Sequence, residues 1–374
     1  MAAKRIVLMY ISEVSGHHSA TLAIEKAIRT IAPDTEILNI NGFNYTNPIS
    51  EKVINRLYMA VIKRTPQLWN YLYDNPDVVK ILENIKRAIH KFNSPKLKNL
   101  FDDFKPDVIA CTQAFPCGMV ADYKKFCNSH IPLVAVLTDY IPHSYWIYDT
   151  VDYYVVPSEE VGLRLSQKGV DEKKIRAFGI PHDPKFARPV DRNEVFKKLD
   201  LNPAVPTILI MGGGQGLGPI KTIVSSLERV NGEVQEIVIT GNNRKLYNSL
   251  SSTIKKFRKK IVLFGYANNV HELMEVSSLI ITKPGGITTA EALAKNLPML
   301  IIEPIPGQEA NNTLYLTQKG AAIHVDNLKR INVIVEDLLL HPQKIDFLRQ
   351  SVGLIRKPNA SMDTAKLLLN SGNG

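Results

Sequence analysis

The stretch TKPGGITTAEALA, residues 282–294, decides how this sequence folds at its most informative corner. The apolar run SSLIIT leads into it and predicts a β-strand, and TTAEALA predicts a helix that leads out. Gly285 and Gly286 tolerate backbone angles that other residues avoid, and they let another molecule approach the main chain. We expect Thr288 or Thr289 to cap the helix start. Because the free N–H groups and dipole of a helix start favour an anion, the corner is either a phosphate cradle or a plain turn.

Strands and helices alternate on both sides of this corner, in two series. The predicted strands of the first series are KRIVLMYIS, TEILNI, PDVIACT, PLVAVLTD and DYYVVPS, and those of the second are TILIMGG, EIVITG, KIVLFGY, LIIT and PMLIIEP. This pattern predicts an α/β protein with two Rossmann-like doubly wound domains that face a cleft. The Pro-rich, charged segment 183–206 is the best linker candidate. We expect an N-terminal domain over 1–185, a C-terminal domain over 205–345 and a helical tail over 346–374 that packs back on the first domain.

Composition restricts the class of protein and of partner. The 374 residues are 45% hydrophobic and 22% charged, which is typical of a soluble globular protein of two domains. No run reaches the roughly 18 apolar residues of a membrane-spanning helix. The three cysteines fit neither a disulfide framework nor a zinc pattern, so we expect a reducing cytoplasm. The net charge of +10 favours an anionic partner, which is nucleic acid, anionic lipid or a phosphorylated substrate.

A second glycine-rich corner, MGGGQGLGP at 211–219, follows another predicted strand. Its glycines do not match the dinucleotide fingerprint, because leucine or proline stands where the third glycine is needed. The sequence also lacks the G-x-x-x-x-G-K-[ST] pattern of a P-loop kinase or nucleotide-hydrolysing enzyme. The backbone N–H groups of Gly213 and Gly214 remain candidates for holding an anion. The alternative is that this segment is only a tight turn. The presence of a second such corner in the same domain argues against that alternative.

Three further features of the C-terminal half suit a nucleotide sugar. In IPGQEANNT, 305–313, Gly307 precedes Gln308 and Glu309, a pair that can hold sugar hydroxyls, or Glu309 simply favours a helix start. The main chain of Gly265 and Tyr266 follows a predicted strand and can pair with a flat base. Glu291 lies on the helix of the opening corner, where a carboxylate can accept hydrogen bonds from a ribose diol. These loops together predict one nucleotide-sugar site.

The N-terminal half offers two candidates for proton transfer. His17, in VSGHHSA, follows the first predicted strand, and a histidine can accept a proton near neutral pH. Asp139, in LTDYIPHSYW, follows another buried strand and is a second candidate for a base or an orienting acid. We expect the neighbouring His18 to point elsewhere. The sequence contains no Asp-x-Asp triplet, so we expect neither a divalent metal nor another cofactor.

The motifs SGHHSA, TDYIPHSYW, FGIPHDPKF, GYANNVHELM, TKPGGITTAEALA and PIPGQEANN resemble the diacylglycerol glycosyltransferases, from about residue 5 to about residue 325. That family includes the plastid monogalactosyldiacylglycerol synthases and the processive diacylglycerol glucosyltransferases of Gram-positive bacteria. The resemblance implies the GT-B arrangement, with the donor on the C-terminal domain. It also implies transfer of a hexose from UDP-glucose or UDP-galactose to diacylglycerol, with inversion and without a metal. The GlcNAc transferase that forms lipid II is more distantly similar.

The resemblance also assigns roles to individual residues. His17 occupies the position of the family's loop histidine, and Asp139 that of the aspartate in its Thr-Asp motif. The contacts to diphosphate and ribose fall on Pro284, Gly285, Gly286, Thr288 and Glu291, and the sugar-binding turn falls on Gly307, Gln308 and Glu309. The sequence departs from the family at Val14 and Ser15, where many members have glycine, and at Tyr148, which replaces a histidine. Inversion needs one displacement, so we expect His17, with or without Asp139, to be the base.

The segment 45–105 is an insertion with the composition of a membrane-binding helix. It holds 11 Lys and Arg against 6 Asp and Glu, and VINRLYMAVIKR places apolar residues at helical spacing. A core helix with a solvated basic side is the alternative. With the resemblance, we expect contact with an anionic lipid surface and a peripheral place on the inner face of the cell membrane.

Two other readings are open. A UDP-GlcNAc-using transferase or epimerase shares the two-domain architecture, but an epimerase needs no lipid-facing insertion. A nucleic-acid binder is favoured by the charge alone, has no recognisable motif here and leaves the sugar-site loops unexplained. We therefore expect no nucleic-acid partner.

Overall fold

A computed structural model describes residues 3–13, 15–42, 96–142 and 144–372. It divides the chain into two compact units. The first contains Met1–Pro184, Ile305–Gln308 and Asn359–Gly374, and the second contains Lys185–Pro304 and Glu309–Pro358. Residues 43–95 of the predicted insertion lie outside the described residues, and residues 96–104 are helical.

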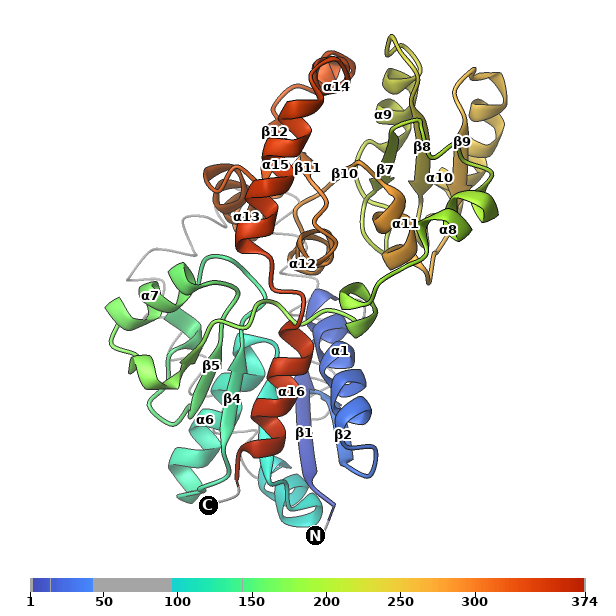
Figure 1. The fold of residues 1–374 in the computed structure, drawn as a ribbon. Coiled ribbons are helices and arrows are strands. Elements are labelled where there is room, and N and C mark those ends of the chain that lie inside the picture. The colour runs from blue at the N-terminus through green and yellow to red at the C-terminus, as the bar shows by residue number, and fades with distance from the viewer. Residues whose placement is uncertain (1–2, 14, 43–95, 143, 373–374) are drawn as a thin grey trace. The chain divides into compact units, whose positions relative to one another are not determined.

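The first unit contains a six-stranded parallel sheet with the order β2-β1-β3-β4-β5-β6 (Figure 1). Its strands are β1 (Arg5–Tyr10), β2 (Glu36–Asn41), β3 (Val108–Cys111), β4 (Leu133–Val136), β5 (Tyr153–Val155) and β6 (Ile175–Arg176). Its helices include α1 (Gly16–Ile31), α6 (Ala114–Cys127), α7 (Glu159–Gln167) and α16 (Ala360–Asn370), with short 3-10 turns at Ser144–Trp146 and Glu172–Lys174.

Both faces of this sheet are covered by helices, which explains why its strands are apolar throughout. Successive side chains of β1 enter different cores. Ile6 and Leu8 pack with α1 and α16, while Val7 and Met9 pack with α6 and α7. The C-terminal helix α16 lies along α1 in Figure 1, and its Leu368 is fully buried in their shared core.

The second unit contains a six-stranded parallel sheet with the order β12-β11-β10-β7-β8-β9. Its strands are β7 (Thr207–Met211), β8 (Gln235–Ile239), β9 (Ile261–Phe264), β10 (Leu279–Thr282), β11 (Met299–Ile302) and β12 (Ala322–Val325). Its helices are α8 (Arg192–Leu199), α9 (Ile220–Leu227), α10 (Arg244–Thr253), α11 (Val270–Val276), α12 (Gly286–Ala294), α13 (Gln308–Gln318), α14 (Ile331–Leu340) and α15 (Pro342–Ile355), with 3-10 turns at Pro184–Ala187, Ile254–Lys256 and Leu328–Arg330. The first residue of α13, Gln308, is grouped with the first unit.

The predicted fold class of two Rossmann-like domains is confirmed, and every predicted strand is present. The edge strands β6 and β12 were not predicted, because one has two residues and the other carries a histidine among four. The candidate linker 183–206 contains the helix α8. The segment 346–374, expected to be one tail, holds the end of α15 in the second unit and α16 in the first.

One carboxyl group is buried in the core of the second unit. Glu236 on β8 is fully buried, and neither of its carboxylate oxygens has a hydrogen-bond partner among the described residues. Strand alternation places it on the face of Val238, which belongs to the apolar core under α9 and α14. Burial raises the pKa of Glu236 from 4.5 to about 8, while the nearby Lys259 lowers it and Glu228 raises it.

We therefore expect the free energy of unfolding to fall as pH rises from about 4.5 to about 8. In this range the unfolded chain has ionised Glu236 while the folded chain still holds its proton, so the folded state is favoured below the range and loses that advantage across it. Denaturant unfolding at about pH 5 and about pH 8 should show a difference on the order of a few kcal/mol, and Glu236→Gln should remove the part that comes from this group. The part that comes from Asp139, whose pKa burial raises to about 7, should remain. Glu233→Gln, at an exposed position of the preceding loop, is the control. An equal decline in Glu236→Gln and the unaltered protein would contradict this origin.

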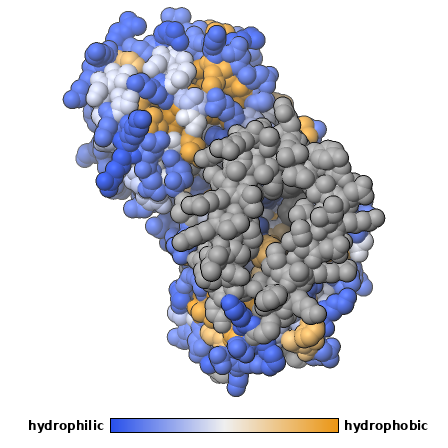
Figure 2. Space-filling model, turned by 180° about the vertical axis from the view of Figure 1, so that it is seen from behind, coloured by the Kyte–Doolittle hydropathy of each residue, from blue (hydrophilic) through white to orange (hydrophobic). Residues whose placement is uncertain are grey.

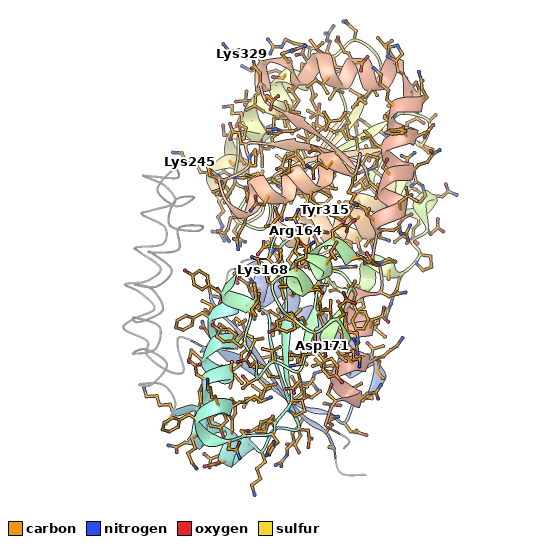
Figure 3. All side chains as sticks on the ribbon, turned by 90° about the vertical axis from the view of Figure 1, so that its left-hand side faces the viewer. Arg164, Lys168, Asp171, Lys245, Tyr315 and Lys329 are labelled. Carbon is orange, nitrogen blue, oxygen red and sulfur yellow. The ribbon has the colours of Figure 1, made fainter. Side chains whose placement is uncertain are left out.

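On the face that Figure 2 shows, the described residues are mainly hydrophilic, with scattered apolar areas. Arg164, Lys168, Lys245 and Lys329, labelled in Figure 3, are exposed. Among the described residues, no helix is both long enough and apolar enough to cross a membrane.

Candidate functional site

In the first unit, His17 is the second residue of α1 and follows the carboxyl end of β1. Ser15 caps this helix, and its hydroxyl accepts a hydrogen bond from the N–H of His18. The side chain of His17 is half-buried, and burial lowers its pKa, an effect partly offset by a hydrogen bond to the carbonyl oxygen of Thr112. The lowered pKa favours the unprotonated ring of His17, which can accept a proton.

The Nδ1 atom of His17 has two close oxygen neighbours. The carbonyl oxygen of Thr112 lies 2.9 Å away, and the hydroxyl oxygen of Thr138 lies 3.0 Å away. Thr112 follows β3 and Thr138 follows β4, so the ends of three strands meet at this histidine. His18 stacks instead on Tyr10, with ring centroids 4.3 Å apart.

Asp139, the second predicted catalytic residue, follows Thr138 directly in the sequence after β4. Burial raises the pKa of Asp139 to about 7. Gln308, a predicted sugar-binding residue that belongs to the first unit, donates a hydrogen bond from Nε2 to Asp139 Oδ2 at 2.9 Å. Asp139 can thus accept or donate a proton near neutral pH.

In the second unit, the predicted glycine loops meet at one edge of the sheet, where β7, β8 and β9 end. Gly214 accepts a hydrogen bond from the N–H of Asn242 at 2.9 Å, and Gly265 accepts one from the N–H of Gly241 at 3.1 Å. Gly213 has a φ of +67°, and no atom lies within 4 Å of where its Cβ would be. Tyr266 is 62% exposed, and its ring approaches the Cβ position of Gly214. Gly214 and Tyr266 are exposed, so a ligand can approach the main chain at this edge of the sheet.

The corner 284–289 differs from its prediction in two respects. The helix α12 begins at Gly286 with Gly285 as its N-cap, and no side chain caps it, so the prediction that Thr288 or Thr289 caps it is wrong. Both threonines lie inside the first turns, because the helix starts earlier than their capping preference suggested. Gly285 has a φ of −64° that any residue can adopt, and none of the described residues lies within 4 Å of where its Cβ would be.

The buried hydroxyl of Thr289 has no hydrogen-bond partner among the described residues, while Thr288 and Glu291 are half-buried on the same helix. Gly307 has a φ of +93°, which favours glycine at the turn before α13. Uncapped N–H groups at the start of α12 and a nearby buried hydroxyl are suited to an anion.

Two residues that the sequence reasoning missed tie this corner to α13. Lys283 Nζ lies 3.3 Å from Glu309 Oε2, with only 14% and 22% of the two side chains exposed. The buried Asn312 donates a hydrogen bond from Nδ2 to the carbonyl oxygen of Pro284 at 2.9 Å. Lysine beside the Pro-Gly-Gly turn was a signal in the sequence, but its partner becomes visible only in the fold. The described residues contain no group of three His, Cys, Asp or Glu side chains placed to hold a metal ion.

Comparisons with known proteins cover both units. Residues 17–181 match the family model for monogalactosyldiacylglycerol (MGDG) synthase, and residues 207–350 match the C-terminal domain of glycosyltransferase family 28. The chain is 30% identical to a processive diacylglycerol beta-glucosyltransferase of Bacillus subtilis strain 168, over 96% of this chain and 93% of the relative. The enzyme of the same name from Bacillus licheniformis is 31% identical over 86% and 83% of the two chains.

Solved structures show the same fold at low sequence identity. MurG of Acinetobacter baumannii aligns with a TM-score of 0.67 and 12% identity, over 98% of this chain and 99% of that chain. A UDP-N-acetylglucosamine 2-epimerase aligns with a TM-score of 0.60 and 14% identity, over 99% and 96%. Anabaena Alr3699/HepE in complex with UDP-glucose aligns with a TM-score of 0.54 and 12% identity, over 98% and 99%.

Proposed function

The chain belongs to the diacylglycerol glycosyltransferase family, and for it we propose a donor, an acceptor and a set of catalytic and substrate-binding residues. It is an enzyme, a hexosyltransferase that uses a UDP-sugar and diacylglycerol to make a glycolipid. Within that activity we infer that the sugar is glucose rather than galactose, because the relatives are named beta-glucosyltransferases. A UDP-GlcNAc epimerase is not favoured, since its likeness to this chain extends only to the fold.

The observation that carries the donor site is the open, uncapped start of α12 at Gly285. We assign the diphosphate to the N–H groups of Gly285 and Gly286 and to Thr288 and Thr289. Developing negative charge on the leaving β-phosphate is stabilised there by the helix N-terminus, so the proposed reaction relies on no cofactor. Glu291 is assigned to the ribose, the main chain of Gly265 and Tyr266 to the base, and Gly213 and Gly214 to the phosphates. Gly307, Gln308 and Glu309 are assigned to the sugar, with Lys283 holding the Glu309 carboxylate.

We assign the acceptor chemistry to the first unit. In an inverting transfer, the hydroxyl oxygen of diacylglycerol attacks the anomeric carbon while UDP leaves with the electron pair of the broken bond. His17 accepts the hydroxyl proton, and Asp139, with its pKa near 7, is placed to orient the acceptor or to share the proton.

We further propose that the enzyme binds peripherally to the inner face of the membrane through anionic lipid. The support is the basic, aromatic composition of residues 45–105, with 11 Lys and Arg against 6 Asp and Glu. The exposed Arg164 on α7 (Glu159–Gln167) and the exposed Lys168, which follows that helix, add positive charge to the first unit (Figure 3).

A transfer assay tests the proposed donor. Radiolabelled UDP-glucose and UDP-galactose are each incubated with the protein and diacylglycerol in mixed micelles, and the lipid products are separated by chromatography. We expect label to move into lipid from UDP-glucose at least about 10-fold faster, which a single differently placed hydroxyl can achieve when its hydrogen bond is lost. Preferential use of UDP-galactose would overturn the choice of sugar, and label in neither lipid product would overturn the function.

A further inference from the structure

The hydrogen bonds of His17 determine which ring nitrogen carries its proton. Nδ1 lies 2.9 Å from the carbonyl oxygen of Thr112, and a carbonyl oxygen can only accept. Nδ1 therefore carries the hydrogen in the neutral ring, and Nε2 has the free electron pair that accepts a proton. The Thr138 hydroxyl oxygen, 3.0 Å from the same Nδ1, must then accept from that N–H as well.

We propose that Thr138 is a positioning residue for His17, whose hydroxyl joins the Thr112 carbonyl in fixing the ring so that Nε2 faces the acceptor. This inference rests on the proposed function, in which His17 is the base. When the acceptor oxygen bonds to the anomeric carbon, its O–H bond breaks and an Nε2–H bond forms, while the bond to UDP breaks and UDP takes the electron pair. The resulting imidazolium is stabilised at Nδ1–H by two neutral acceptors.

A neutral pair of acceptors suits a base that must be unprotonated before reaction. A carboxylate at Nδ1 raises the pKa of a histidine and keeps it protonated at neutral pH. A carbonyl and a hydroxyl orient the ring with a much smaller increase, and here burial lowers the pKa of His17. Thr138 is itself buried, with 4% of its surface exposed, so its hydroxyl is held in place.

Separate contacts hold the backbone of His17, which makes the role of Thr138 testable. The hydroxyl of Thr112 donates to the carbonyl oxygen of His17 at 2.9 Å, and the hydroxyl of Thr21 lies 3.1 Å from the same oxygen. The two hydroxyl oxygens are 2.9 Å apart. Removing the Thr138 hydroxyl therefore leaves the position of the main chain intact and changes only the ring.

Other titratable groups lie on the elements around His17 and are unchanged by substitution of Thr138. These groups are Tyr10 on β1, Glu13 and His18 around the start of α1, Cys111 on β3, Cys117 on α6 and Asp139 after β4.

The test compares Thr138→Val and Thr138→Ser with the unaltered full-length protein and with Thr30→Val. Thr30 is an exposed threonine on the same helix as His17, and its hydroxyl donates a hydrogen bond to the carbonyl oxygen of Lys26, four residues earlier. We expect Thr138→Val to lower kcat/KM about 3–10-fold, the effect of one lost hydrogen bond, and Thr138→Ser to restore it. The acid limb of the pH profile should move to lower pH only in Thr138→Val, because its imidazolium loses an acceptor.

Nitrogen NMR of 15N-histidine-labelled protein gives a second readout that needs no substrate. The His17 signal, identified by its loss in His17→Gln, should show hydrogen on Nδ1 in the neutral ring and a lower pKa in Thr138→Val than in the unaltered protein. Hydrogen on Nε2, or an unchanged pKa together with an unchanged pH profile in Thr138→Val, would overturn the inference. Failure of the proposed function is distinguishable, because then the unaltered protein transfers no sugar while the NMR result stands independently.

Discussion

Replacing His17 with alanine should lower turnover by about 10²-fold or more, with a smaller change in the KM for the donor. The ring sits at the meeting point of three strand ends, and Thr112 and Thr138 contact its Nδ1. Removing it takes away the group that accepts the acceptor proton. Steady-state kinetics with UDP-glucose and diacylglycerol in mixed micelles measure the effect.

His18→Ala is the matched control, because His18 is the adjacent histidine and stacks on Tyr10. We expect it to retain most activity. Asp139→Asn separates the two candidate bases. If His17→Ala kept near-normal turnover while Asp139→Asn lost it, the base would be Asp139 and not His17.

Replacing Gly285 with leucine should weaken donor binding about 10²-fold while leaving the fold intact. The N-cap glycine of α12 has a φ of −64°, and none of the described residues lies within 4 Å of an added Cβ, so a side chain can begin here without backbone strain. That side chain would occupy the space that we assign to the diphosphate. Losing one or two charge-assisted hydrogen bonds corresponds to a loss of affinity of about 10²-fold. Protection by UDP in a thermal unfolding assay measures the loss.

Gly353→Leu is the control for this substitution. Gly353 is an exposed glycine on α15 without a positive φ, and its nearest contact at the Cβ position is 3.6 Å. Gly285→Leu should keep a free energy of unfolding within about 0.5 kcal/mol of the unaltered protein. Gly353→Leu should do the same or be more stable, because leucine favours a helix more than glycine does. Normal UDP protection in Gly285→Leu would show that the diphosphate binds elsewhere.

The fold was predictable because buried parallel strands are continuous apolar runs bounded by turn residues. The strand β1 shows why, since Ile6 and Val7 enter different cores and neither face can be polar. A short edge strand need not be an apolar run, and the two-residue strand β6 was not predicted for that reason. The division of 346–374 between the two units depends on which core α16 joins, and the sequence of one helix does not reveal its packing partner.

The residues of the candidate site that follow strands were predictable from the sequence, but the contacts between their side chains were not. His17 and Asp139 were identified because each follows an apolar run, and the hydroxyl of Thr138, the residue before Asp139, contacts the ring of His17. The role of Thr138, the pairing of Lys283 with Glu309 and the bond from Asn312 to Pro284 join residues distant in the chain. The capping preference of threonine placed the helix start at 288–289, but α12 begins at Gly286, closer to the end of the preceding strand.

The most direct test of the account is the structure of the lipid made by the purified protein from UDP-glucose and diacylglycerol. NMR of the isolated product gives the configuration at its anomeric carbon. One displacement with His17 as the base predicts a β-glucosyl diacylglycerol from the α-linked donor. An α-linked product, or an epimerised sugar nucleotide with no glycolipid, would contradict it.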